Sequence, residues 1–201
     1  MTEQTDRNER PESDYSRQTV RVKGGLRTGY TTGSCAAASA KAATLALLTD
    51  QSVSEVIIHL PVGQDATFAM HRCEWLDDER VLCSVIKDGG DDPDATHGAE
   101  ICVTVSRDLQ GSGLRIIGGP GVGTVTRPGT GIEVGEPAVT RVPRRMMTES
   151  VAEAAQSQGL EPGAGFVAEV SVTGGEAIAE KTTNARLGVL GGISILGSTG
   201  V

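Results

Sequence analysis

Residues 87–98 carry the densest set of groups that could do chemistry, with the sequence Lys-Asp-Gly-Gly-Asp-Asp-Pro-Asp-Ala-Thr-His-Gly. The candidates are Lys87, Asp88, Asp91, Asp92, Asp94 and His97. Carboxylates this close repel one another unless a cation, hydrogen bonds or burial compensates. An EF-hand is excluded because the acidic residues do not alternate and no glutamate follows at the expected place. A metal loop, an acid–base pair and hydroxyl recognition remain, with a charged surface loop as the alternative, and we assign no metal ligands.

A second candidate is the segment 28–35, Thr-Gly-Tyr-Thr-Thr-Gly-Ser-Cys, which precedes an alanine-rich stretch. Residues 35–48 lack a helix breaker and predict a helix that Thr32, Gly33 or Ser34 could cap. Amides at a helix N-terminus, with hydroxyls beside them, can bind a phosphate or a carboxylate. A capped structural helix is the alternative, and the P-loop pattern occurs nowhere. A helix start would also lower the pKa of the Cys35 thiol.

Two glycine-containing segments complete the set. Residues 118–123 read Gly-Gly-Pro-Gly-Val-Gly, but Thr124 breaks the dinucleotide-binding fingerprint. Either a turn between strands or a close approach of backbone to a ligand would explain these glycines. Further along, Lys181, Asn184 and Arg186 offer hydrogen-bond donors to a ligand with several carboxylates. A solvated helix end is the alternative for that cluster.

The elements that must position these groups are short strands and two helices. Strands are predicted at 53–60, 66–73, 80–87, 100–107, 114–117 and 166–172, with a second helix at 143–159 and a short one at 175–183. Strands that pair locally, with helices between them, favour an α+β fold over a doubly wound one. We expect a mixed sheet of hairpin-connected strands, packed with the alanine-rich helix and the second helix, and not a Rossmann methyltransferase.

Composition narrows the function classes. The 201 residues carry a formal net charge of −8, and aromatic residues make up 2%. These values argue against nucleic-acid binding, which needs basic patches and aromatic faces. No apolar stretch is long enough for a transmembrane helix, and the polar N-terminus lacks a signal peptide, so we expect a cytoplasmic protein. Residues 1–19 are predicted to be a disordered tail.

Five ordered segments together resemble the CbiD family of cobalt-precorrin-5B C1-methyltransferases. They are residues 26–38, 87–98, 118–126, 142–144 and 181–197. Three small departures are Ser34 where the family has Thr, Gly89 where it has Ala, and Ala185 where it has Pro. Family members continue past residue 201, so the resemblance implies an α+β domain over 20–190 and the start of a connection to a further α/β region at 191–201.

The resemblance implies transfer of a methyl group from S-adenosylmethionine to C1 of a cobalt corrinoid in anaerobic cobalamin biosynthesis. The corrinoid is the small-molecule partner, and a homo-oligomer is left open. Asp91 and His97 are the candidate catalytic residues, and His97 is also a candidate cobalt ligand. The substrate- or cofactor-binding candidates are Thr31, Thr32, Gly33, Ser34, Lys87, Asp88, Asp92, Asp94, Lys181, Asn184 and Arg186.

Two alternatives remain open. In a small-molecule kinase, the helix start would hold phosphate and the acidic loop would hold magnesium. In a non-catalytic corrinoid-binding fragment, ligand would bind without methyl transfer. An interface for a further region would also leave apolar surface exposed near residues 187–196, which predicts poor solubility for this chain by itself.

Overall fold

The computed structural model describes residues 20–21, 27–91 and 93–201. The predicted tail at 1–19 and Asp92 therefore lie outside the described residues. In chain order the elements are β1 (Val20–Arg21), β2 (Arg27–Thr28), α1 (Thr32–Thr49), β3 (Glu55–Leu60), β4 (Gln64–Ala69), β5 (Arg72–Asp77), β6 (Arg80–Ile86), β7 (Glu100–Ser112), β8 (Leu114–Gly118), β9 (Gly121–Val122), β10 (Thr124–Val125), α2 (Arg141–Ser157), β11 (Ala164–Val172), α3 (Gly175–Ala179), the 3₁₀ helix η2 (Asn184–Leu187), β12 (Val189–Leu190) and β13 (Gly192–Ile193).

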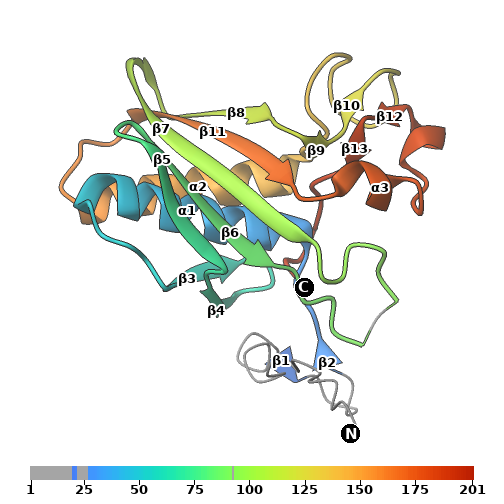
Figure 1. Cartoon of the computed structure of the whole chain (residues 1–201), viewed down its shortest axis with the longest axis horizontal. Helices are drawn as coiled ribbons and strands as arrows, with labels where there is room; N and C mark the ends of the chain where they lie inside the picture. The colour runs from blue at the N-terminus through green and yellow to red at the C-terminus, as the bar shows by residue number, and fades with distance from the viewer. Residues whose placement is uncertain (1–19, 22–26, 92) are drawn as a thin grey trace, which may run out of the picture.

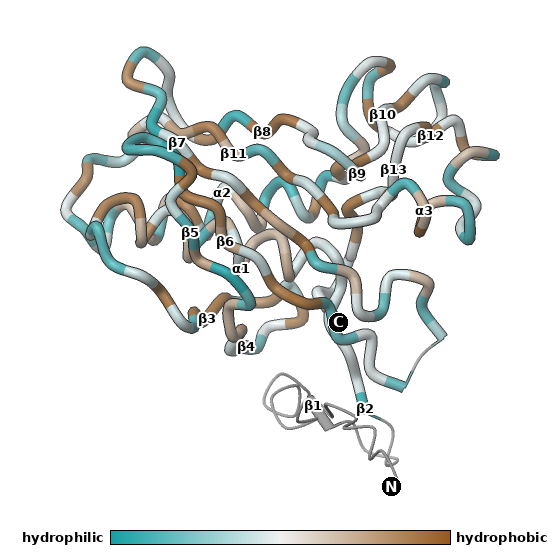
Figure 2. The backbone as a smooth tube through the Cα atoms, in the orientation of Figure 1, coloured by the Kyte–Doolittle hydropathy of each residue, from teal (hydrophilic) through white to brown (hydrophobic). Residues whose placement is uncertain are grey.

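A five-stranded mixed sheet forms the centre of the molecule, with strand order β5-β6-β7-β11-β8 (Figure 1). Neighbouring strands are antiparallel except β11 and β8, which run parallel. Hydrophobic residues along β6 and β7 run through the middle of the chain trace (Figure 2). The predicted α+β class with a mixed sheet is confirmed. The predicted β3–β4 hairpin is also present, as a separate two-stranded ribbon.

One strand prediction is wrong in detail. The segment 66–73 is not a single strand, because β4 ends at Ala69 and β5 begins at Arg72. Strand β5 lies at the edge of the sheet and is mostly exposed, with a charged residue at each end. An exposed edge strand lacks the alternation of buried and exposed residues by which a strand is recognised in sequence.

Helix α1 is enclosed on several sides. It packs against α2, against β6 and β7 of the sheet, and against β3 of the hairpin. Thirteen of its 18 residues are buried, and they are mostly alanines with a few serines and threonines. Small side chains allow this close packing on every side, which explains the alanine-rich sequence. Helix α2 instead buries one face, with Met147, Val151 and Ala154 at helical spacing.

The glycine-rich segment 118–123 lies in close contact with backbone from distant parts of the chain. A Cβ atom on Gly121 would lie 2.1 Å from the carbonyl oxygen of Val172. Likewise, a Cβ on Gly175 or Gly192 would lie 2.3 or 2.2 Å from the carbonyl oxygen of Gly121. Strand β9 pairs in parallel with β13 at this point. Of the two explanations left open by the sequence, the turn between strands is present, because the Val122 amide donates to the carbonyl oxygen of Gly119 between β8 and β9. The close approach at Gly121 is to backbone of the same chain and not to a ligand.

The end of the described chain is integrated into the fold. Strand β13 pairs with β9, and residues 196–200 bond to the start of α1. The domain boundary at 190 and the further region stay predictions. The expected apolar exposure is present, because Leu187, Leu190 and Leu196 are each more than half exposed.

Candidate functional site

A pocket of about 400 Å³ opens where three segments distant in the sequence meet. The first leads into α1, the second is the acidic loop after β6, and the third runs from the end of α3 to the chain's last residues. Its walls are Thr28, Gly29, Tyr30, Thr31, Thr32, Lys87, Gly89, Asp94, Ala95, Thr96, Thr182, Thr183, Asn184, Ile193, Ser194, Leu196 and Val201. The volume lies in the range of small-molecule sites.

A crossing of two glycine segments holds the first two walls together. A Cβ on Gly29 would lie 2.0 Å from the carbonyl carbon of Gly89, and one on Gly90 would lie 2.3 Å from the carbonyl oxygen of Arg27. The amide of Tyr30 donates to the carbonyl oxygen of Asp88 at 2.8 Å. Because neither backbone could come this close with a side chain present, glycine at these positions builds the pocket.

Lys87, whose side chain is buried, forms an ion pair with the exposed Asp94 on the pocket wall. The Lys87 side chain is 3% exposed, and its Nζ donates to Asp94 Oδ2 at 2.5 Å. The amide and the hydroxyl of Thr96 both donate to Asp94 Oδ1 at 2.7 Å. Burial by itself would raise the pKa of Asp94, but the hydrogen bonds from Lys87 and Thr96 outweigh it and lower that pKa. Asp94 is therefore an ionised carboxylate near neutral pH and a weak base.

The other described aspartates of the acidic loop face Arg27. Asp88 is buried and accepts two hydrogen bonds from the Arg27 guanidinium, at 2.6 and 3.1 Å. Its Oδ1 also accepts from the Gly90 amide at 2.9 Å. Asp91 is exposed, and its Oδ2 accepts from the Arg27 amide at 2.6 Å. These two carboxylates anchor the loop to β2 and are not among the pocket-lining residues.

His97 also lies outside the set of lining residues, and its side chain is 55% exposed. Its Nδ1 accepts a hydrogen bond from the Gly89 amide at 3.0 Å. An imidazole whose Nδ1 accepts must carry its proton on Nε2. In this arrangement the Gly89 amide occupies the Nδ1 lone pair. The geometry therefore offers no support for His97 as a base or as a metal ligand.

The start of α1 is already hydrogen bonded to the chain's own C-terminal segment. The amide of Gly33 and the hydroxyl of Thr32 donate to the carbonyl oxygen of Leu196, at 3.0 and 3.1 Å. The hydroxyl of Ser34 donates to the carbonyl oxygen of Gly200 at 2.7 Å. Thr31 is the capping residue, since its Oγ1 accepts from the Ser34 amide. The predicted capping residues 32–34 instead lie within the first turn of the helix, because the helix begins at Thr32, three residues earlier than expected.

The expectation that Cys35 has an activated thiol is wrong. Its side chain is 1% exposed. Burial raises the pKa of Cys35 to about 12, and this outweighs the lowering effects of nearby Lys87 and of its own backbone hydrogen bond. A buried thiol with that pKa stays protonated and behaves as a small core residue.

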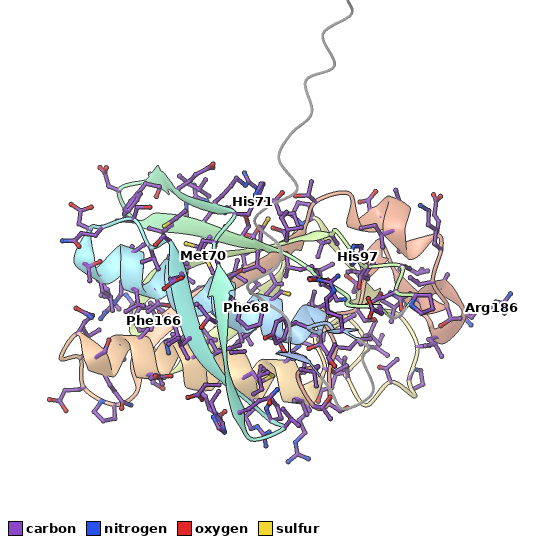
Figure 3. All side chains as sticks on the ribbon, turned by 90° about the horizontal axis from the view of Figure 1, so that it is seen from below. Phe68, Met70, His71, His97, Phe166 and Arg186 are labelled. Atoms are coloured by element: carbon purple, nitrogen blue, oxygen red, sulfur yellow. The ribbon has the colours of Figure 1, made fainter. Side chains whose placement is uncertain are left out.

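The cluster predicted at 181–186 separates in space. Asn184 is buried and lines the pocket, where its Nδ2 donates to the carbonyl oxygen of Gly192 at 3.3 Å. Lys181 and Arg186 are exposed and are not lining residues. Figure 3 shows Arg186 extending outward from the end of the molecule, away from His97.

Of the predicted site residues, five line the pocket: Thr31, Thr32, Lys87, Asp94 and Asn184. Sequence reasoning missed several polar lining residues, namely Thr28, Tyr30, Thr96, Thr182, Thr183 and Ser194. All but Ser194 lie within three residues of a predicted one, and Ser194 falls within the family motif 181–197. Their hydroxyls carried no signal of their own, because threonine and serine are common in turns.

The described residues contain neither a cluster of metal-ligating side chains nor a membrane-spanning helix. Over residues 20–21, 27–91 and 93–201, no group of three or more His, Cys, Asp or Glu side chains is arranged to hold a metal ion. Within the same residues, no helix is both long and apolar enough to cross a membrane.

The fold and the site define an α+β domain with a polar, ligand-sized pocket at one end of its sheet. The CbiD family model matches residues 19–201, so the chain belongs to the CbiD family. The resemblance drawn from the five sequence motifs is confirmed.

Curated relatives carry a more specific name. The chain is 51% identical over 182 residues to a protein of Geobacillus sp. (strain WCH70) and 52% identical over 177 residues to one of Salinispora arenicola, both named cobalt-precorrin-5B C(1)-methyltransferase. The matches cover 90% and 88% of this chain but 49% and 45% of the relatives. The chain thus spans about half the length of the curated relatives it matches.

A solved structure shares the fold. It is the 1.9 Å crystal structure of a cobalamin biosynthesis protein (cbiD) from Archaeoglobus fulgidus, with a TM-score of 0.69 and 30% identity. The match covers 91% of this chain and 57% of the other. The prediction that the fold is CbiD-like and not a Rossmann methyltransferase is confirmed.

Proposed function

We propose that this chain is the part of a cobalt-precorrin-5B C1-methyltransferase that binds one of its two reactants in the pocket. The observation that carries the proposal is the convergence of three of the five family motifs on that pocket. Membership of the family and the names of the curated relatives support the reaction. Neither the kinase nor the non-catalytic alternative is favoured by a specific observation.

The pocket suits part of a reactant pair better than a whole macrocycle. At about 400 Å³ it has room for S-adenosylmethionine or for one edge of a corrinoid. Threonine hydroxyls can bond ribose hydroxyls or carbonyl groups, and Lys87 with Asp94 presents opposite charges side by side. That pair is complementary to the carboxylate and ammonium of an amino acid, so the residues present fit S-adenosylmethionine.

S-Adenosylmethionine supplies a methyl group on a positively charged sulfur, which is neutralised as the ring carbon takes the methyl. Such a transfer needs orientation and exclusion of water more than covalent help. Thr31, Thr32 and Asn184 would orient the bound group, and the Lys87–Asp94 pair would fix its charged end. We propose no catalytic base, because Asp94 is the carboxylate among the lining residues and its pKa is lowered.

Turnover with labelled S-adenosylmethionine and cobalt-precorrin-5B, under anaerobic conditions, tests the proposal. This chain is compared with a version extended to the full length of its relatives. We expect label in the corrinoid from the extended protein, and its loss when Thr32→Val and Asn184→Leu are combined. A double change of the exposed residues Glu149→Gln and Glu153→Gln on α2 is the matched control.

The possible results of this experiment distinguish the proposed function from the two alternatives. Label from the extended protein by itself makes this chain a binding portion of the enzyme. Label from both proteins places all essential groups within this chain. No label from either, together with magnesium-dependent ATP binding, would replace the proposal with a kinase. Ligand binding without transfer by the extended protein would favour the non-catalytic reading.

A further inference from the structure

Lys87 has bonding capacity that the described residues leave unused. A lysine ammonium has three donors. Among residues 20–21, 27–91 and 93–201, Lys87 Nζ makes one side-chain hydrogen bond, to Asp94 Oδ2. Its side chain is only 3% exposed, so bulk water reaches it poorly. Burying a charge with unsatisfied donors is costly unless another partner binds them.

The unused donors belong to a side chain on the pocket wall. Lys87 is the cationic side chain among the described lining residues, and Asp94 is the anionic one. Around them the lining groups are hydroxyls, the Asn184 amide, glycines and a few apolar side chains. An anion that enters this pocket therefore meets one concentrated positive charge, which is already held in place by a carboxylate.

We propose that Lys87 binds a carboxylate of the ligand in this pocket, with Asp94 as the residue that positions the ammonium. The inference rests on the proposed function, which supplies two reactants that carry carboxylates. One source is the amino-acid end of S-adenosylmethionine, and the other is the acid side chains on the rim of the corrinoid. Both would make the same charge-assisted N–H···O bond, which is among the stronger hydrogen bonds in proteins.

The surroundings of Asp94 favour this role. Its Oδ1 is occupied by the amide and the hydroxyl of Thr96, which leaves Oδ2 directed at Lys87. The lowered pKa of Asp94 keeps this carboxylate charged at neutral pH, so its Oδ2 offers the Lys87 side chain a fixed negative partner.

Calorimetric titration of this chain with two pairs of probes tests the inference. S-Adenosylhomocysteine has the amino-acid end, and 5′-methylthioadenosine lacks it. Cobyrinic acid has free carboxylates, and cobinamide has them amidated. We expect Lys87→Met to weaken the carboxylate-bearing member of one pair by about 10- to 100-fold and to leave its partner probe unchanged. The affected pair identifies the source of the carboxylate.

Three further variants keep the result interpretable. Lys41→Met is the matched control, because Lys41 is 12% exposed and pairs with Glu153 outside the pocket. It should leave all four affinities unchanged. Asp94→Asn should also reduce the difference in affinity between the two probes of the affected pair, but by less than Lys87→Met does. A purely structural effect would not reduce that difference selectively. If Lys87→Met unfolds, Lys87→Met combined with Asp94→Asn removes both charges together.

Two results would overturn the inference, and they differ from each other. Binding of a carboxylate probe by the unmodified chain that Lys87→Met leaves unchanged would remove Lys87 from recognition while the proposed function stands. Failure of the unmodified chain to bind any of the four probes would overturn both the inference and the proposal that this pocket holds a reactant.

Discussion

The loop between β6 and β7 has an ion pair at each end, Lys87–Asp94 and Arg72–Glu100, and the two pairs have different surroundings. The loop leaves β6 at Lys87 and enters β7 at Glu100, and the Lys87 amide bonds to the carbonyl oxygen of Ala99 at 2.8 Å. Successive residues of a strand face opposite sides. Glu100 pairs with Ile86 across the two strands, so Lys87, the residue after Ile86, faces the other side. Lys87 lies on the side of α1, whereas Glu100 lies on the opposite face with Arg72.

In the Arg72–Glu100 pair, both oxygens of the Glu100 carboxylate accept hydrogen bonds from neighbouring side chains. Arg72 Nε and the Ser84 hydroxyl donate to Glu100 Oε1 at 2.6 and 2.7 Å, and the Thr173 hydroxyl donates to Oε2 at 2.7 Å. The Lys87 pair, in contrast, leaves donors unused beside a pocket. The difference indicates that a buried charge points to a ligand only when its own neighbours do not satisfy it. Glu100 should therefore govern stability, and Lys87 should govern binding.

The largest expected effect comes from separating the walls of the pocket. Gly29→Ala would place a Cβ 2.0 Å from the carbonyl carbon of Gly89, so one backbone must move away. We expect a loss of about 3 kcal/mol or more in the free energy of unfolding, together with loss of ligand binding. Urea unfolding and titration with S-adenosylhomocysteine and cobyrinic acid measure both.

Gly98→Ala is the control for that change. Gly98 lies in the same loop as Gly89 and has a φ of +76°, but a Cβ there would meet nothing within 4 Å. Gly98→Ala should lower the free energy of unfolding by only about 1–2 kcal/mol, which is the cost of placing alanine in a left-handed backbone conformation. If Gly29→Ala costs no more than Gly98→Ala, the two walls can separate freely, and the crossing does not build the pocket.

Glu100→Gln should have the next largest effect, on stability and not on binding. Burial raises the pKa of Glu100, but hydrogen bonds from Thr173, Ser84 and Arg72 outweigh it and lower that pKa below its ordinary value of 4.5. The carboxylate therefore stabilises the fold fully above about pH 4.5, and this contribution is lost as the pH falls through the folded-state pKa.

Thermal unfolding from pH 7 to pH 3 tests this dependence. At neutral pH the variant should be less stable by about 1–2 kcal/mol, and the gap should close in acid. A gap that stays constant down to pH 3 would mean that the charge of Glu100 contributes nothing.

The smallest effect concerns the thiols near the two pairs. Cys35 interacts with the charge of Lys87, and Cys102 lies beside Arg72, yet burial raises the pKa of both. We expect native Cys35 to resist iodoacetamide at pH 8, while the half-buried Cys73 reacts first. Mass spectrometry of the alkylated peptides gives the order, with the urea-unfolded protein as the control. Rapid labelling of native Cys35 would show that the start of α1 opens to solvent.

Local chemistry made much of the fold predictable. The alanine-rich stretch forms α1, the pattern of Met147, Val151 and Ala154 forms α2, and the alternating apolar segments form β6, β7 and β11. These predictions succeed because helix propensity and hydrophobic periodicity act within a few residues. Edge strand β5 escaped prediction, because its exposure follows from its place in the sheet.

The site was only partly predictable. Lys87, Asp94 and Asn184 line the pocket as expected, whereas Asp91 and His97 bond to the loop's own surroundings. Residues 32–34 bond to the C-terminal segment, more than 160 positions away. Spacing along the chain can show that a polar group is present, but only three-dimensional contacts show which group takes its hydrogen bonds.

The sequence by itself determined the family, the mixed α+β class and the segments that carry polar groups, because ordered motifs and local periodicity are written in neighbouring residues. The tertiary structure alone decided which charges are satisfied and which face a cavity. Gly29 crosses Gly89, the chain's end bonds to α1, and one loop places Lys87 and Glu100 on opposite faces. These outcomes depend on contacts between distant segments, and hydrogen-bond capacity is shared out only when those segments meet.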